Sequence, residues 1–149
     1  MEQAVFTNMC MIYDDNSDGT RKILVQDRLN KNWPGITFPG GHVEKTESFV
    51  ESTIREVKEE TGLTVSNLQL CGIKQFQTLD DARYVVLLYK TNCFEGELKS
   101  SDEGKVFWIK AEEIDNYPLA NDFRQMYEIF INEDMSEFYY HKNWNIRLL

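Results

Sequence analysis

The chain has 149 residues, a length that suits one domain of ordinary size. Apolar residues make up 42% and charged residues 28%, which provides material for a core and excludes wholesale disorder. Lys and Arg number 16 and Asp and Glu 25, so the net charge is −9, and long nucleic acid held by basic charge alone is a poor partner. An anionic ligand would need positive charge from outside the chain, most simply a metal ion.

The sequence gives no sign of a membrane or of an oxidising compartment. No apolar run approaches the ~20 residues of a membrane helix. The first basic residue is Arg21, so the basic start of a signal peptide is missing. Cys10, Cys71 and Cys93 are odd in number and lack metal-ligand spacing. We expect a reduced, cytoplasmic chain with small buried thiols and no membrane partner.

The first third of the chain is predicted to form a β-hairpin followed by a loop. Residues 4–13 and 21–28 are strand-like runs, and the polar segment 14–19 between them is typical of a turn. Residues 29–41 contain Trp-Pro-Gly and Pro-Gly-Gly, so we expect a loop with at most a short strand at 36–38.

The clearest helix is predicted at 48–62. Ser48 and Glu51 have the spacing of a capping box, and Gly62 stands where a glycine would end the helix. Three apolar residues at helical spacing are predicted to form its buried face: Val50, Ile54 and Val57.

The rest of the chain alternates strand-like runs with helical segments. We expect strands at 68–77, 84–92 and 105–110, a helical turn at 111–116, a second full helix at 121–132 and a last edge strand near 138–140. One side of the second helix carries Phe123, Met126, Tyr127 and Phe130. Since no linker or repeat divides the chain, residues 1–149 are predicted to form one α+β domain with a mixed sheet packed between helices.

Three carboxylates lie close together on the first predicted helix. At 100° per residue, Glu56, Glu59 and Glu60 share an arc of about 100°. Their charges repel one another and lie near the helix C-terminus, where the helix dipole disfavours anions. A hard divalent cation would remove both penalties, because oxygen ligands at this spacing can converge on Mg²⁺. The alternative is a solvated acidic face.

The residues around these carboxylates follow a longer pattern. It runs from Gly41 over five residues to Glu47, over seven more to Arg55-Glu56, and ends with an aliphatic residue, Glu59-Glu60 and Gly62-Leu63. The stretch 41–63 resembles the Nudix box of the Nudix hydrolases at all nine specified positions. A chance match is on the order of 10⁻⁸ per window. The strand-rich flanks also suit the family's α/β/α sandwich, with a mixed sheet between helices.

The resemblance implies a divalent metal site. Glu56, Glu59 and Glu60 would be the side-chain ligands, and the backbone carbonyl of Gly40 would join them. This all-oxygen set suits Mg²⁺, with Mn²⁺ as a substitute, and leaves positions for water and substrate phosphate.

Four further box residues are expected to be structural. Glu47 and Arg55 would pair and brace the loop against the helix, because the guanidinium fork suits a carboxylate. Gly41 and Gly62 would supply backbone geometry that a Cβ atom hinders.

The reaction implied is hydrolysis of a nucleoside diphosphate linked to another group. A water molecule, activated by metal and base, would displace at phosphorus. The catalytic candidates are Glu56, Glu59 and Glu103. Glu103 precedes the aromatic-aliphatic strand at 105–110, where family members often place an extra acid, but it also suits an ordinary exposed loop residue.

Two shorter segments resemble the MutT-type enzymes that hydrolyse oxidised purine nucleotides. Phe38-Pro39-Gly40-Gly41 opens the box, and Pro118-Leu119-Ala120-Asn121 resembles the segment whose Asn reads the purine. The Asn121 amide offers a donor and an acceptor that match O6 and N7–H of 8-oxoguanine, although it could equally cap the following helix.

Other substrate contacts are less specific. Phe38 could stack on the base or belong to the core. Arg28, which ends the second predicted strand, is a further substrate-binding candidate. Trp33 could line the pocket or cover the core, and the isolated His42 and His141 are given no catalytic role.

These observations predict a Mg²⁺-dependent, MutT-like nucleoside triphosphate pyrophosphohydrolase. It would cleave (8-oxo-)dGTP or a related triphosphate to the monophosphate and pyrophosphate, as a monomer or homodimer. The second hypothesis is a Nudix hydrolase of ADP-ribose, a dinucleotide polyphosphate or a nucleotide sugar. The sequence does not show the extra N-terminal dimerisation domain expected of an ADP-ribose hydrolase, which counts against this second hypothesis. The third is a nucleotide-sensing module without turnover, which the intact box carboxylates disfavour.

Overall fold

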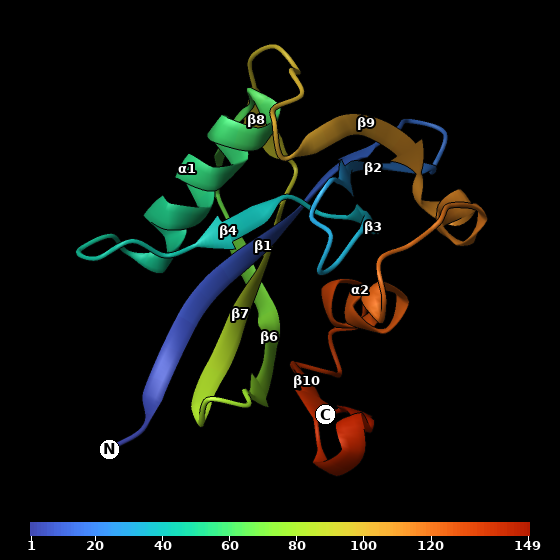
Figure 1. Cartoon of the computed structure of the whole chain (residues 1–149). Coiled ribbons are helices and arrows are strands. Elements are labelled where there is room, and N and C mark those ends of the chain that lie inside the picture. Colours follow the sequence, from blue (N-terminus) through green and yellow to red (C-terminus); the bar gives the residue numbers. More distant parts are fainter.

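The computed structural model describes all 149 residues, and its main feature is a large mixed sheet (Figure 1). Nine strands form this sheet: β1 (Gln3–Asp15), β2 (Arg21–Arg28), β3 (Gly35–Thr37), β4 (Gly40–His42), β6 (Gln69–Gln77), β7 (Ala82–Thr91), β9 (Gly104–Lys110), β10 (Glu137–Tyr140) and β11 (Ile146–Leu148). A separate ribbon pairs β5 (Thr64–Ser66) with β8 (Cys93–Glu95). The helices are α1 (Phe49–Thr61) and α2 (Phe123–Ile131), with short 3₁₀ turns at Ala111–Asn116 and Lys142–Trp144.

The long strand β1 organises the sheet. It runs parallel to β7 over ten paired residues, and on its other edge it pairs antiparallel first with β4 and then with β2. The strand order is β11-β10-β6-β7-β1-β2-β3, and β9 pairs with β2. The predicted hairpin of residues 4–13 and 21–28 is confirmed.

Side chains from the two faces of β1 enter two separate cores. Met9 and Met11 pack in a cluster with α2, whereas Cys10 and Ile12 pack in a second cluster with Val57 of α1. This alternation is the period-two pattern of a strand that is covered on both faces. In Figure 1, α1 and α2 lie on opposite sides of β1. The predicted α+β sandwich with a mixed sheet between helices is therefore confirmed.

The termini of α1 follow the local sequence signals. Ser48 is the N-cap, and its hydroxyl and the Glu51 side chain form both hydrogen bonds of the capping box. Gly62 ends the helix at φ 79°, in the left-handed conformation that glycine adopts most easily.

The predicted buried face of α1 is wrong at Val50, which is 40% exposed, and Ile54 is only partly buried. Only Val57 of the three predicted residues is buried. The face that packs on the sheet carries mainly polar side chains: Ser52, Thr53, Val57, Glu60 and Thr61. Glu60 accepts hydrogen bonds from outside the helix, which offset part of the cost of its burial.

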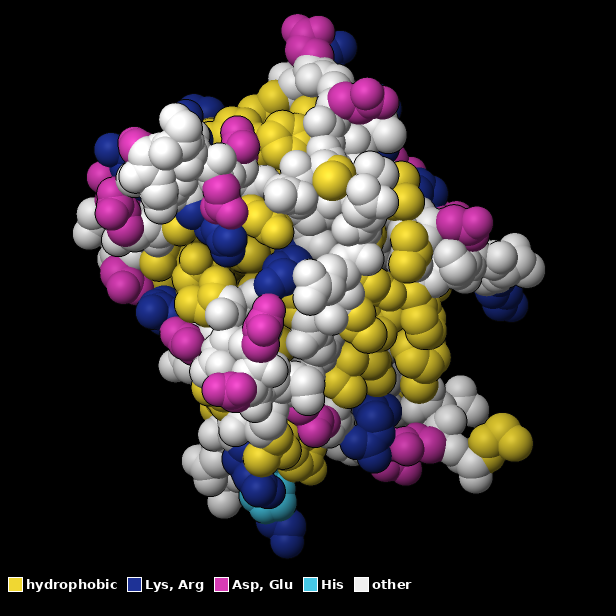
Figure 2. All heavy atoms as spheres, turned by 180° about the vertical axis from the view of Figure 1, so that it is seen from behind, with side chains coloured by type: hydrophobic (Ala, Val, Ile, Leu, Met, Phe, Trp, Pro, Cys, Tyr) yellow, Lys and Arg dark blue, Asp and Glu magenta, His cyan; other side chains and the backbone are white.

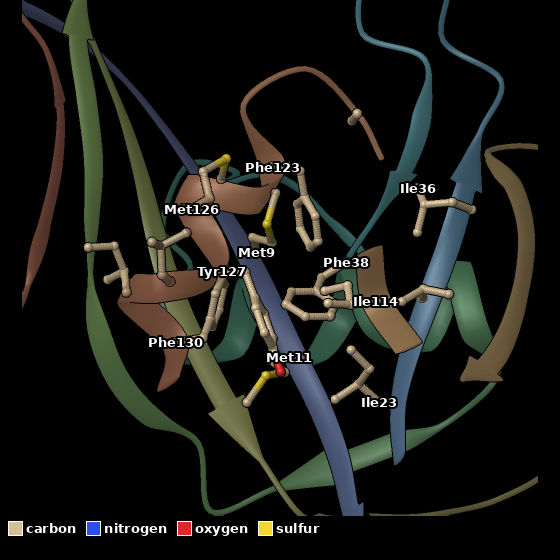
Figure 3. Packing of buried hydrophobic residues seen from close by; sticks show 14 of the residues in the cluster. Met9, Met11, Ile23, Ile36, Phe38, Ile114, Phe123, Met126, Tyr127 and Phe130 are labelled. Atoms are coloured by element: carbon tan, nitrogen blue, oxygen red, sulfur yellow. The ribbon is translucent and has the colours of Figure 1, made fainter. Parts of the chain in front are cut away.

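The chain contains more strands than predicted. The structure adds the short strands β4, β5, β8 and β11, whereas β3 lies near the short strand expected at 36–38. The second helix begins at Phe123, two residues later than predicted, and Asp122 occupies its N-cap position. Its predicted apolar side is buried, as Figure 3 shows for Phe123, Met126, Tyr127 and Phe130.

Two findings bear on the predictions about membranes and cysteines. No helix has the length and apolar character needed to span a membrane. Cys10 is buried, but Cys71 and Cys93 are only partly so, and none is bonded to another.

Seen from behind, apolar side chains gather in a band on one side of the surface (Figure 2). Among the exposed apolar residues, the rings of Phe6 and Phe49 lie 5.4 Å apart. Whether the chain is a monomer or a homodimer stays a prediction.

Candidate active site

A cavity of about 590 Å³ has two chemically different ends. We call the first the carboxylate end; it is lined by Gly40, Gly41, Glu56, Glu60 and Glu103. We call the second the aromatic end; it is lined by Trp33, Lys74, Phe76, Asn121, Met126 and Tyr140. Sequence analysis named all five residues of the first group but, as pocket or substrate candidates, only Trp33 and Asn121 of the second.

A row of paired residues crosses the sheet between the two ends. Lys74 of β6 pairs with Val86 of β7, Val86 pairs with Thr7 of β1, and Thr7 pairs with His42 of β4. All four residues line the cavity, because directly paired residues face the same side of a sheet. With about 4.8 Å between strands, the row spans roughly 14 Å.

Glu60 is the buried carboxylate of the site. It is 4% exposed, and its Oε2 accepts hydrogen bonds from the Gly40 amide at 3.0 Å and from Gln26 Nε2 at 3.4 Å. Burial raises the pKa of Glu60 to about 8, and the charges of Glu56 and Glu103 add to the rise against the Gly40 hydrogen bond. The surroundings of Glu60 thus stabilise its ionised form poorly.

Glu56 lies beside Glu60 at the carboxylate end and is held from two directions. Its Oε1 accepts from Arg55 Nη1 at 2.9 Å, and the carboxylate lies against Gly41, where a Cβ atom would come within 2.3 Å of it. Burial raises the pKa of Glu56, while the Arg55 guanidinium opposes the rise. A glycine at position 41 therefore leaves the space that the Glu56 carboxylate occupies, and any side chain there would displace it.

Arg55 connects the box loop to the helix, as predicted. Its Nε and Nη2 donate to the two Glu47 oxygens at 2.8 and 2.7 Å, and Nη2 also donates to the His42 carbonyl at 3.0 Å. The Arg55 guanidinium lowers the pKa of Glu47 to about 2. This two-bond contact fixes the loop that carries Gly40 and Gly41.

Glu59 does not reach the cavity. Its side chain is 58% exposed and lies 3.3 Å from Arg55 Nη1, outside the carboxylate end. The structure contains no group of three His, Cys, Asp or Glu side chains arranged to hold a metal ion. Glu56, Glu60 and Glu103 line the same cavity. The metal and catalytic roles assigned to these residues and to Glu59 stay predictions.

Phe38 is a core residue at the cavity wall. Its side chain is fully buried, and its ring meets Phe123 and Phe130 edge-on with centroids 4.9 and 5.0 Å away. Figure 3 shows Phe38 among Phe123, Ile114 and Met11. The geometry favours the core interpretation, and stacking of Phe38 on a base stays a prediction.

Asn121 and Arg28 both line the cavity, in agreement with their assignment as candidates. Because Asp122 is the N-cap of α2, the interpretation of Asn121 as the cap is wrong. The Asn121 backbone carbonyl accepts from Trp33 Nε1 at 2.8 Å, whereas its side-chain amide makes no hydrogen bond within the protein. Arg28 Nε is buried and has no partner, which leaves a donor for a ligand oxygen.

Sequence reasoning missed Lys74. It is 8% exposed, lies on β6 between β10 and β7, and lines the cavity. Burial lowers the pKa of Lys74 to about 8, against the attraction of Asp122. The only sequence signal for this position is that Lys74 and Phe76, two residues apart on one strand, point to the same face of the sheet. This signal is weak, because a lysine on a strand is more often exposed at the surface.

The NUDIX domain family matches residues 7–130, which is most of the chain. The chain belongs to the Nudix hydrolase family. An uncharacterized Nudix hydrolase of Bacillus subtilis, YvcI, is 30% identical over 74% of this chain and 69% of its own length. Among solved structures, the mutator MutT protein of Bacillus halodurans is 28% identical, with 97% of both chains covered and a TM-score of 0.76. These similarities make the chain a MutT-like Nudix hydrolase.

The match to relatives with named substrates spans a smaller share of their length. An ADP-ribose pyrophosphatase of Methanocaldococcus jannaschii is 36% identical over 56% of this chain, and an oxidized purine nucleoside triphosphate hydrolase of Danio rerio is 32% identical over 59%. The chain spans about half the length of each, 51% and 53%. The two relatives differ in substrate, so the substrate of this chain is not decided by similarity.

Proposed function

We propose that this Nudix hydrolase is a divalent-metal-dependent pyrophosphohydrolase of nucleoside triphosphates. It would convert a purine triphosphate such as (8-oxo-)dGTP to the monophosphate and pyrophosphate. The observation that carries the proposal is the single cavity that joins the box carboxylates to an aromatic, amide-bearing end. A nucleotide with its phosphates at the carboxylate end would place its base at the aromatic end.

The carboxylate end fits Mg²⁺ or Mn²⁺ in its donor chemistry. Glu56 and Glu60 are crowded carboxylates whose pKa values are raised, and a cation would relieve both burial and mutual repulsion. Mg²⁺ commonly uses one or two protein carboxylates and completes its shell with water and substrate phosphate, so a third glutamate is not needed. The Gly40 carbonyl is the further candidate ligand. When bound, the ion would neutralise phosphate charge and lower the pKa of a water molecule.

The chain's own residues would then do the remaining work. Of the carboxylates that line the cavity, Glu56 and Glu103 are our candidates for accepting a proton from the attacking water. The buried, unpartnered Nε of Arg28 would donate to a phosphate or sugar oxygen. The free amide of Asn121 would pair with the purine edge.

A substrate panel tests this proposal. We expect 8-oxo-dGTP or dGTP, incubated with enzyme and Mg²⁺, to give the monophosphate and pyrophosphate by chromatography, faster than ADP-ribose or a nucleotide sugar. The second candidate, ADP-ribose hydrolysis, is favoured by similarity to the archaeal ADP-ribose pyrophosphatase. Preferential formation of AMP and ribose phosphate from ADP-ribose would replace the first proposal with the second. Binding of nucleotides without any product would indicate a sensing module.

A further inference from the structure

Lys74 is a buried ammonium group that forms no salt bridge, although the Asp122 carboxylate, which accepts a hydrogen bond from Tyr140 Oη, attracts it from a longer distance. The Lys74 Nζ lies 3.4 Å from Met126 Sδ and 5.2 Å from the ring centroids of Trp33, Phe138 and Tyr140. Thioether sulfur is a weak acceptor, and cation–π contacts replace only part of the hydration that an ammonium loses. Three strong N–H donors are therefore held in the protein with little to donate to.

The position of Lys74 connects it to the substrate rather than to the core alone. It lines the aromatic end of the cavity and lies three strands from His42 of β4, roughly 14 Å away by strand spacing. The carboxylate end adjoins β4 through Gly40 and Gly41. A phosphate held there would be too far away for contact with Lys74, whereas the base of the same nucleotide would lie beside it.

The aromatic end also suits a flat heterocycle. Trp33, Phe76 and Tyr140 surround Lys74 Nζ and line the cavity, and aromatic rings of this kind stack on any base. The ammonium adds selectivity, because it donates hydrogen bonds and accepts none. A base with a carbonyl oxygen at this position accepts a hydrogen bond from the ammonium, whereas a base with an amino group there places a second donor against it.

We propose that Lys74 is a specificity-determining residue that donates to a carbonyl oxygen of the nucleobase and selects 6-oxopurines over 6-aminopurines. This inference rests on the proposed function, because it takes a nucleotide as the ligand. It adds a second contact, from β6, to the one proposed for Asn121 from the loop before α2. A space-filling role alone would be served at lower cost by an apolar side chain, since a buried unpaired charge is expensive.

The test measures binding of two monophosphates by calorimetry without metal, so that it does not depend on turnover. Deoxyinosine monophosphate carries the 6-oxo group without a 2-amino group, and deoxyadenosine monophosphate carries the 6-amino group. The wild-type protein is expected to bind the 6-oxo compound at least about tenfold more tightly. Lys74→Met keeps the length and apolar stem of the side chain but removes the donors, and should bring the ratio of the two dissociation constants close to one.

Two further variants control for folding and for loss of charge. Lys74→Gln offers both a donor and an acceptor, so it should also abolish the preference, and it guards against failure of Lys74→Met to fold. Lys90→Met removes a partly buried lysine on β7 whose Nζ bonds the Phe130 carbonyl and does not line the cavity, and it should keep the wild-type ratio. Equal binding of the two monophosphates by the wild-type protein, or a preference retained in folded Lys74 variants, would overturn the proposal. Failure of triphosphate hydrolysis alongside an intact base preference would instead refute the proposed function.

Discussion

The buried carboxyl group of Glu60 has a pKa of about 8, so its charge, and with it the stability of the fold, changes with pH near neutrality. Its ordinary pKa is 4.5, so the folded state binds the proton more tightly than the unfolded state. Its contribution to stability is complete below the ordinary pKa and is lost as the pH rises through about 8.

Glu60→Gln should therefore stabilise the metal-free protein at pH 8.5 and have little effect at pH 5.5. Gln keeps an oxygen that can accept from the Gly40 amide but carries no charge. We expect Tm at the higher pH to rise by at least about 3 °C, since one kcal/mol corresponds to about 2–4 °C in a chain of this size. Thermal melts of both proteins with EDTA at the two pH values measure this. A gain of equal size at both pH values would argue against an ionised, destabilised Glu60.

Asn121 tests base recognition at the level of one amide. If its side chain pairs with the purine, Asn121→Ala leaves ligand atoms unpaired at a cost of about 1–3 kcal/mol. That cost lowers kcat/KM for purine triphosphates roughly ten- to hundredfold. Pyrimidine triphosphates should change little, and Tm should stay constant, because the N-cap of α2 is Asp122. An unchanged purine-to-pyrimidine ratio would remove Asn121 from substrate recognition.

At the scale of elements, the site depends on how closely β4 approaches its neighbours. A Cβ atom on Gly40 would lie 2.1 Å from the Asn8 carbonyl oxygen, whereas one on Gly41 would meet the end of the Glu56 side chain at 2.3–2.5 Å. The first clash is with backbone, which cannot move away. The second is with a carboxylate that can rotate out of its place.

Alanine at these two glycines should separate folding from chemistry. Gly41→Ala is expected to leave Tm nearly unchanged but to lower turnover at least about tenfold, because it displaces the Glu56 carboxylate. Gly40→Ala should lower stability by about 1–3 kcal/mol or more through overpacking. Thermal melts and initial rates on the two variants measure both effects. Full activity in Gly41→Ala would show that the observed position of Glu56 is not needed.

Elements whose signals are local could be predicted from the sequence. Ser48, Glu51 and Gly62 fix the ends of α1 through contacts within a few residues, so pattern and structure agree there. The buried face of α1 could not be predicted, because the hydrogen bonds that the buried Glu60 accepts come from Gly40 and Gln26, which lie in other elements. Strands of three residues, such as β4 and β11, likewise form only when a neighbouring strand supplies their hydrogen bonds.

At the scale of the whole molecule, the site is a product of sheet topology. The Nudix box predicted the carboxylate end because its residues lie within one continuous segment, 41–63. The aromatic end draws on residues far apart in the sequence: Trp33, Lys74, Asn121 and Tyr140. The pairing of β6 with β10 brings Lys74 close to Tyr140, and a hydrogen bond joins Trp33 to the Asn121 carbonyl. No spacing along the chain encodes these contacts. For this reason Asn121 was found only through a family resemblance and Lys74 was missed.

The central claim is that Glu56, at the carboxylate end, supports metal-dependent cleavage of a nucleoside triphosphate. The most direct measurement is pyrophosphate release from 8-oxo-dGTP or dGTP by the wild-type protein with Mg²⁺, with excess EDTA, and by Glu56→Gln with Mg²⁺. We expect release only in the first case, with Glu56→Gln at least about a hundredfold slower at unchanged Tm, because a hard anionic ligand is worth several kcal/mol in the transition state. Full turnover in EDTA, or a fully active Glu56→Gln, would contradict this account.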